Sequence, residues 1–181
     1  MQEKLHIQFS PTRLKKISLL ILCITCFSPW LFAQKLNGTL VTDGNIFQHK
    51  ISPDGTRVVY LGDEDTDQVF ELYSVLITGG TPTKLTTGAT FLRSFEISSD
   101  GARVVYVADQ DVDEVFEIYS VPITGGTPTQ LNGTLVAGGD VGDFKISPDG
   151  TTVVYYADED TNNLNEVYSV PITGGTPVKI S

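Results

Sequence analysis

Residues that carry most enzymatic chemistry are scarce in this sequence. Both cysteines, Cys23 and Cys26, lie in an apolar stretch near the N-terminus, and His49 is the one histidine after residue 33. The sequence also lacks the Gly-x-Ser-x-Gly segment that presents a nucleophilic serine in many hydrolases. A Ser-His-Asp triad and a zinc site both draw on histidine or cysteine, which this chain hardly offers. We therefore predict that the chain is not an enzyme, and that His49 lines a channel or packs against neighbours.

Positive charge is also in short supply. The chain has 12 Lys and Arg against 22 Asp and Glu, which gives a net charge of −10. An acidic surface repels the phosphates of nucleic acids and of anionic membranes, so neither is an expected partner. The same surface permits cation binding.

Only one long apolar run is present, at residues 17–27, and it follows Arg13, Lys15 and Lys16. It is shorter than the roughly 20 residues that span a bilayer, and basic residues before such a run are typical of a secretory signal peptide. We predict that residues 1–33 are a signal, cleaved before Gln34, with no membrane span left afterwards; an uncleaved anchor is the alternative. The protein is then periplasmic or secreted. Four basic residues and one acidic residue leave with the signal. The remaining chain then carries eight basic and 21 acidic residues, a net charge of −13.

The rest of the chain consists of three copies of one unit. The segment Ile-Ser-Pro-Asp-Gly at residues 51–55 recurs at 146–150, and as Ile-Ser-Ser-Asp-Gly at 97–101. The segment Thr-Gly-Gly-Thr-Pro at 78–82 recurs at 124–128 and 173–177. The copies are offset by 46 and then 49 residues. Such spacing indicates a tandem repeat of supersecondary units.

Each unit contains four short runs rich in β-branched and aromatic residues, separated by turn residues, which is the pattern of β-strands. In order along the unit we name these strands a, b, c and d, with Asp-Gly supplying the tight turn between a and b. Strand a is predicted at 47–52, 94–98 and 144–147; strand b at 57–61, 103–108 and 152–157; strand c at 70–77, 116–123 and 167–172; strand d at 83–85, 129–131 and 178–180.

Four-stranded antiparallel units in tandem predict an all-β fold of three propeller blades, at about 46–86, 94–131 and 143–181. The repeat Ile-Ser-Pro-Asp-Gly-Thr-x-Val-Val-Tyr, an Asp-rich turn, and then Glu-x-Tyr-Ser-Val-Pro-Ile-Thr-Gly-Gly-Thr-Pro resembles the TolB-type WD40-like (PD40) β-propeller family. The resemblance covers residues 34–181. It implies a propeller that serves as a non-catalytic interaction module or accompanies a prolyl-oligopeptidase-like hydrolase.

Three blades are fewer than the four to eight that close a ring, so this is a partial β-propeller with open sheet edges. A homodimer would supply six blades, the number that the resemblance implies. The alternative is a truncated copy of a longer propeller. Residues 35–41 copy residues 130–136, so the predicted mature start resembles the strand d end and loop that precede a blade. This copied segment favours functional assembly over truncation. The alternative is that it is only an inherited repeat boundary.

The turns between strands b and c are strongly acidic. Alternating carboxylates with a following Glu at Glu71, Glu117 or Glu166 are oxygen ligands suited to Ca²⁺. A hairpin turn favours the same residue types, and the glycine of an EF-hand loop is missing. The candidate Ca²⁺ ligands are Asp63, Asp65, Asp67, Asp109, Asp111, Asp113, Asp158, Asp160 and Asn162.

These turns share one end of each unit with the d–a connections, which differ in length and composition between the copies, as functional loops do. One of these loops, with Thr90, Phe91, Leu92 and Arg93, is the predicted binding face. We expect a non-catalytic extracytoplasmic module that binds a protein partner. The alternatives are an accessory or truncated fragment of an extracellular hydrolase, and a calcium-binding structural or adhesive repeat protein.

Overall fold

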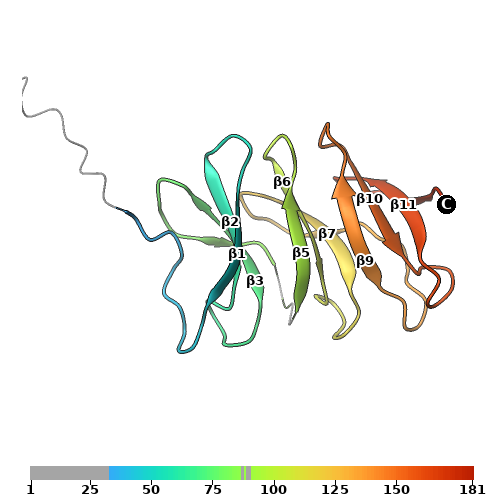
Figure 1. Ribbon diagram of the computed structural model, residues 1–181, viewed down its shortest axis with the longest axis horizontal. Helices are drawn as coiled ribbons and strands as arrows, with labels where there is room; N and C mark the ends of the chain where they lie inside the picture. The colour runs from blue at the N-terminus through green and yellow to red at the C-terminus, as the bar shows by residue number, and fades with distance from the viewer. Residues whose placement is uncertain (1–32, 87, 89–90) are drawn as a thin grey trace, which may run out of the picture. The chain divides into compact units, whose positions relative to one another are not determined.

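The computed structural model describes residues 33–86, 88 and 91–181, and its regular structure is twelve β-strands (Figure 1). The first sheet contains β1 (Ile46–Ile51), β2 (Arg57–Gly62), β3 (Glu71–Leu76) and β4 (Thr83–Lys84). The second contains β5 (Leu92–Ile97), β6 (Arg103–Ala108), β7 (Glu117–Pro122) and β8 (Thr129–Gln130). The third contains β9 (Val141–Ile146), β10 (Thr152–Ala157), β11 (Glu166–Pro171) and β12 (Val178–Lys179).

In each sheet, strands that are consecutive in the chain pair side by side and antiparallel. The prediction of three four-stranded antiparallel units is thereby confirmed. Residues Gln34–Ser181 form one compact unit. Except for Ala33, the predicted signal peptide lies outside the described residues, and none of the described residues belongs to a helix able to cross a membrane.

The hairpin between the first two strands of each sheet is set by the repeated Asp-Gly sequence. Gly55 adopts φ = 71°, a left-handed conformation that glycine enters without strain. The Ser52 hydroxyl donates a hydrogen bond to Asp54 Oδ1 (2.5 Å) and accepts one from the Arg57 backbone N–H (2.9 Å). Because each partner lies within five residues, the turn is specified locally.

The hydrophobic core lies between successive sheets. One cluster joins the first and second sheets, with Val59 and Leu72 against Phe95 and Tyr106. A second joins the second and third sheets. We name the two faces of a sheet after their direction along the chain: the N-side face is turned toward the preceding part of the chain, and the C-side face toward the following part. The second sheet is buried on both faces.

Candidate functional site

The ends of the sheets differ in chemistry, and the candidate site lies at one of them. The d–a connections and the b–c turns meet at the same end, because β1 begins opposite the end of β2, where Ile46 pairs with Gly62. We call this end the loop face. The Pro-Asp-Gly or Ser-Asp-Gly turns and the Gly-Gly turns lie at the other end.

The first aspartate of each acidic turn holds the loop face together. Asp63, Asp109 and Asp158 are all buried, at 2%, 5% and 7% exposure. Each accepts a hydrogen bond at Oδ1 from a backbone N–H in the d–a connection; the donors are Asn45, Phe91 (2.7 Å) and Asp140 (2.5 Å), respectively.

The same aspartate also closes its own turn. The second oxygen of Asp63 accepts from the Gln68 backbone N–H (3.2 Å), and that of Asp158 accepts from the Asn163 N–H (2.8 Å). Gln68 and Asn163 both adopt φ = 63°, a left-handed turn conformation reached here without glycine. These two aspartates therefore have both side-chain oxygens engaged in structural hydrogen bonds.

The remaining acids of the turns point to separate partners. Asp65 pairs with Lys84 (3.2 Å) and Asp160 with Lys179 (3.0 Å), while the Asp67 carboxylate accepts from Gln68 Nε2 (3.2 Å). Asp111, Asp113 and Asn162 are exposed. Across residues 33–86, 88 and 91–181, no three His, Cys, Asp or Glu side chains are grouped so that they could hold a metal ion. The calcium site therefore stays a prediction of the sequence.

The glutamates that follow the acidic turns contact stacked tyrosine pairs. In the first sheet, Tyr60 and Tyr73 stack with centroids 5.3 Å apart. The Tyr73 hydroxyl donates to Glu71 (3.0 Å), and Glu71 also pairs with Lys84 (2.5 Å). The third sheet repeats the arrangement with Tyr168, Glu166 and Lys179. These carboxylates are part of the structural frame.

Acid should weaken the turns at both ends of the sheets. The Ser52 hydroxyl, together with Thr56, lowers the pKa of Asp54 from 3.8 to about 2, and the Asn45 N–H lowers the pKa of Asp63. A carboxylate with a lowered pKa contributes stability above its unfolded value, and this stability is lost as the pH falls through the folded value. The melting temperature should therefore fall between pH 4 and about pH 2.

Circular dichroism melts over that range check this expectation, with Asp54→Asn as the comparison. The variant is expected to show a shallower decline, because it lacks one of the titrating carboxylates. Relief of negative charge repulsion acts in the opposite direction at higher pH, so the comparison is confined to pH 4 and below. A melting temperature that rises on acidification through this window would contradict the assignment.

Aromatic side chains form a continuous ridge across the loop face of the first two sheets. Phe47 contacts Phe70 with centroids 5.0 Å apart, Phe70 contacts Phe91 (5.9 Å), and Phe91 contacts Phe116 (6.1 Å), all edge to face. Phe47 and Phe91 are 55% and 51% exposed. Edge-to-face pairs of this kind fix ring orientations and still leave ring surface available for contact.

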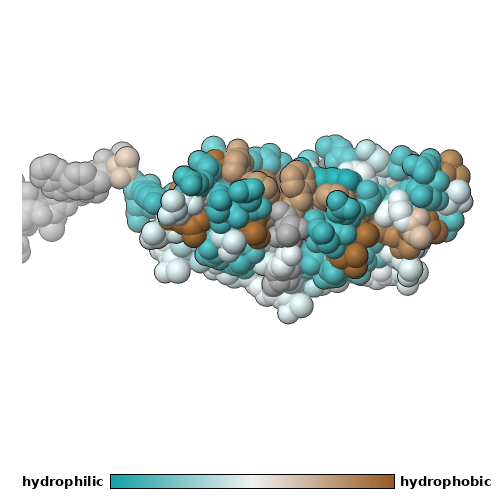
Figure 2. All heavy atoms as spheres, turned by 90° about the horizontal axis from the view of Figure 1, so that it is seen from below, coloured by the Kyte–Doolittle hydropathy of each residue, from teal (hydrophilic) through white to brown (hydrophobic). Residues whose placement is uncertain are grey.

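A small apolar pocket opens in this ridge. It has a volume of about 240 Å³ and is lined by Phe47, Leu61, Phe70, Phe91 and Leu92. Figure 2 views the molecule from the lower side of Figure 1, and on that side hydrophobic residues form separate patches among hydrophilic ones. A pocket below the roughly 300 Å³ typical of small-molecule sites is the size for one apolar side chain.

The structure separates the four residues of the predicted binding face. Thr90 lies outside the described residues. Phe91 is exposed on the ridge, whereas Leu92 is 4% exposed and belongs to the core between the first two sheets. The Arg93 guanidinium lies 3.3 Å from the ring centroid of Phe116 and donates to the Val141 carbonyl (3.1 Å). Arg93 therefore also ties the second sheet to the third.

Sequence reasoning missed Phe47, Phe70 and Phe116. Phe70 and Phe116 occupy the same repeat position, just before the third strand, and this was the one available signal. Their contacts with Phe47 and Phe91 depend on how neighbouring sheets pack. His49, expected in a channel or a packed site, is exposed on β1.

The sheets and their packing define the class of protein as a β-propeller. A protein assigned as TolB, from Agrobacterium tumefaciens, is 25% identical with a TM-score of 0.54, over 75% of this chain and 48% of that one. TolB from Acinetobacter baumannii is 20% identical, with a TM-score of 0.50, and the match covers 70% of this chain and 30% of that one. An oligogalacturonate lyase in complex with manganese is 17% identical, with a TM-score of 0.57, and the match covers 85% of this chain and 47% of that one.

These likenesses place the chain in the TolB-type β-propeller fold. No protein-family model and no curated protein matches the sequence. The chain spans less than half the length of each of the three structures. Because a TolB and a lyase share this fold, the fold alone does not decide between binding and catalysis.

Proposed function

We propose that this chain is a non-catalytic, extracytoplasmic β-propeller module that binds a protein partner at its loop face. The observation that carries the proposal is the exposed aromatic pocket of Phe47, Phe70 and Phe91. Exposed aromatic side chains held by neighbouring rings resemble the anchor regions of protein interfaces, which are enriched in aromatic residues and arginine. The basic and apolar pattern of residues 1–33 supports the extracytoplasmic location.

The charge of the loop face indicates what kind of segment fits. The acidic turns on the same face carry exposed carboxylates, among them Asp67 and Asp111, and the chain after residue 33 has a net charge of −13. Opposite charge across an interface speeds association and selects partners. The expected partner segment therefore presents one large apolar side chain to the pocket and has lysine or arginine beside it.

Selection of displayed peptides against the unit 34–181 tests this function. Peptides that combine a large apolar residue with flanking basic residues should be enriched. Replacement of Phe91 by alanine should weaken binding of a selected peptide by roughly 10-fold or more, since a truncated anchor costs about 1 to 2 kcal/mol or more. Affinity should also fall as the salt concentration rises.

Leu76→Ala is the matched control, because Leu76 is exposed by 47% at the opposite end of the first sheet. This variant should bind the peptide like the unmodified chain. Equal losses in both variants, or selected peptides without basic residues, would contradict the proposed site.

A further inference from the structure

The packing of one sheet against the next is repeated twice within this chain, at the same positions of the repeat. On the C-side face of the first sheet, Val59, Leu72 and Leu85 are at most 1% exposed. On the second sheet the equivalent positions are Val105, Ile118 and Leu131, and all three are fully buried against the third sheet. Apolar residues at these positions therefore mark a face that receives a following blade.

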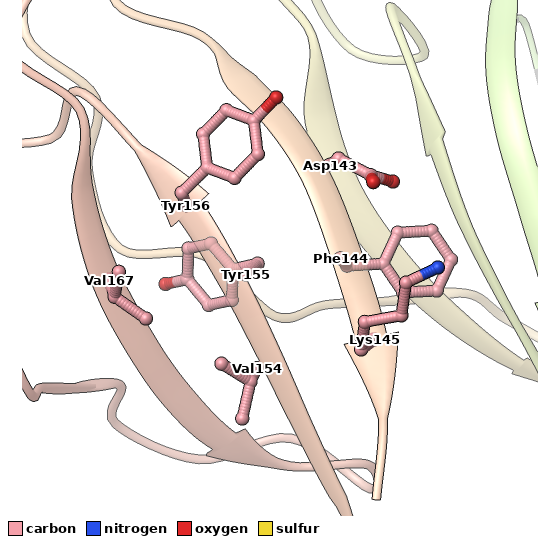
Figure 3. A pocket seen from close by; sticks show the side chains of 7 residues that line it. All are labelled: Asp143, Phe144, Lys145, Val154, Tyr155, Tyr156 and Val167. Carbon is pink, nitrogen blue, oxygen red and sulfur yellow. The ribbon is translucent and has the colours of Figure 1, made fainter.

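The C-side face of the third sheet has the same pattern but is uncovered. Its residues at the three positions are Val154, Val167 and Ile180, and Ile180 is 57% exposed. Tyr156 on β10 is 41% exposed, whereas its equivalent in the second sheet, Val107, is fully buried. Val154, Tyr156 and Val167 line a hollow of about 160 Å³ on this face, with Asp143 and Lys145 beside it (Figure 3).

The N-side face of the first sheet also exposes apolar residues whose equivalents in the second sheet are buried. Ile46 and Ile77 are 37% and 41% exposed, although their equivalents in the second sheet, Leu92 and Ile123, are each 4% exposed. Ile51 is 56% exposed. Exposure of three isoleucines on one face of an acidic protein to water is unfavourable unless another apolar face covers them.

The segment before the first sheet shows what this face accepts. Leu36 packs against Val58, Tyr60, Tyr73 and Val75. Residues 35–41 repeat 130–136, so Leu36 occupies the position that Leu131 takes in the cluster joining the second and third sheets. The N-side face of the first sheet is therefore built to receive a large aliphatic residue from the last strand of a preceding blade.

We propose that the C-side face of the third sheet docks onto the N-side face of the first sheet of a second copy of this chain. The contact continues the interface that the chain already makes twice internally, which is the reason for assigning a second copy as the occupant. Ile180 of one copy takes the place of Leu36 on the other, and Leu36 moves aside. Two such contacts join two copies into a ring of six blades, within the four to eight of closed propellers. This inference is independent of the loop-face function.

Sedimentation velocity on the unit 34–181 tests the proposal. The expected result is a folded species with twice the mass of one chain. Tyr156→Asp places a charge on the C-side face and Ile51→Asp places one on the N-side face, so each variant alone should be monomeric. An equal mixture of the two should recover part of the dimer, because one of its two contacts pairs two unmodified faces.

Val112→Asp is the control, since Val112 is 56% exposed in the b–c turn of the second sheet, whose two faces are already covered within the chain. It should remain dimeric, and circular dichroism should show all three variants folded. A monomeric unmodified chain, a dimer that survives both face substitutions, open polymers, or a mixture that stays monomeric would each overturn the proposal. A misfolded Tyr156→Asp variant would be replaced by Tyr156→Ser in the same mixing experiment.

Discussion

Replacement of Phe144 by alanine is expected to lower the free energy of unfolding by about 3 to 5 kcal/mol. The Phe144 ring is 3% exposed and lies in the cluster that joins the second sheet to the third. Alanine leaves a cavity there that rigid neighbouring strands fill only in part. Because domains of this size are stable by only about 5 to 15 kcal/mol, one such loss removes much of the total. Urea unfolding followed by circular dichroism measures the change.

Phe47→Ala provides a comparison with the same chemistry in a different setting. Phe47 is 55% exposed at the loop face, where it contacts Phe70. Its removal should cost about 1 kcal/mol, in the range of a single aromatic pair. Equal losses in the two variants would contradict the view that stability resides between the sheets and that Phe47 is available for binding.

Alkaline pH is expected to unfold the chain over a narrow interval above pH 10. Burial raises the pKa of six tyrosines, that of Tyr168 to about 12 and the others further. A tyrosine with a raised folded pKa contributes stability that is fully present below the unfolded pKa of about 10 and is lost as the pH rises above it. Above pH 10, each buried tyrosine lowers the free energy of unfolding by roughly 1 kcal/mol for each pH unit, and the effects of the six tyrosines add. The other five are Tyr60, Tyr73, Tyr106, Tyr119 and Tyr155.

Tyrosinate absorbance and circular dichroism, recorded on the same samples, measure this effect. The absorbance of the core tyrosines should rise only together with loss of β-structure. Tyr106→Phe removes one titrating group and the hydrogen bond to Gln110 (2.6 Å), so it should be less stable at neutral pH, with a deficit that shrinks above pH 10. Progressive ionisation of all tyrosines with an unchanged dichroism spectrum would contradict the buried assignment.

The strands and turns could be predicted because their causes are local. Strand b of the first unit was expected at 57–61, and β2 spans Arg57–Gly62. Strand c of the third unit was expected at 167–172, and β11 spans Glu166–Pro171. Successive residues of the Val-Val-Tyr run in strand b point to opposite faces of the sheet, and the Asp-Gly turn before it fixes the register of the hairpin. The repeats provided this pattern three times.

The site was predictable only in part, because its residues meet through packing between sheets. The loop that contains Phe91 and Arg93 was identified from its variability, but the sequence did not show that Leu92 points into the core. The alternating acids of the turns suggested metal ligands. In the structure the first acid of each turn is a hydrogen-bond acceptor for a distant backbone N–H, such as that of Asn45, 18 residues away from Asp63. Such pairings follow from sheet order and not from local pattern.

The most direct test of a loop-face binding module is to map where a selected peptide binds on the isotope-labelled unit 34–181 by nuclear magnetic resonance. The account predicts that the largest shift changes fall on Phe47, Phe70 and Phe91 and on the acidic turns beside them, with the peptide's apolar side chain in contact with the rings. Changes confined to the Pro-Asp-Gly and Gly-Gly turns, at the opposite end of the sheets, would contradict it.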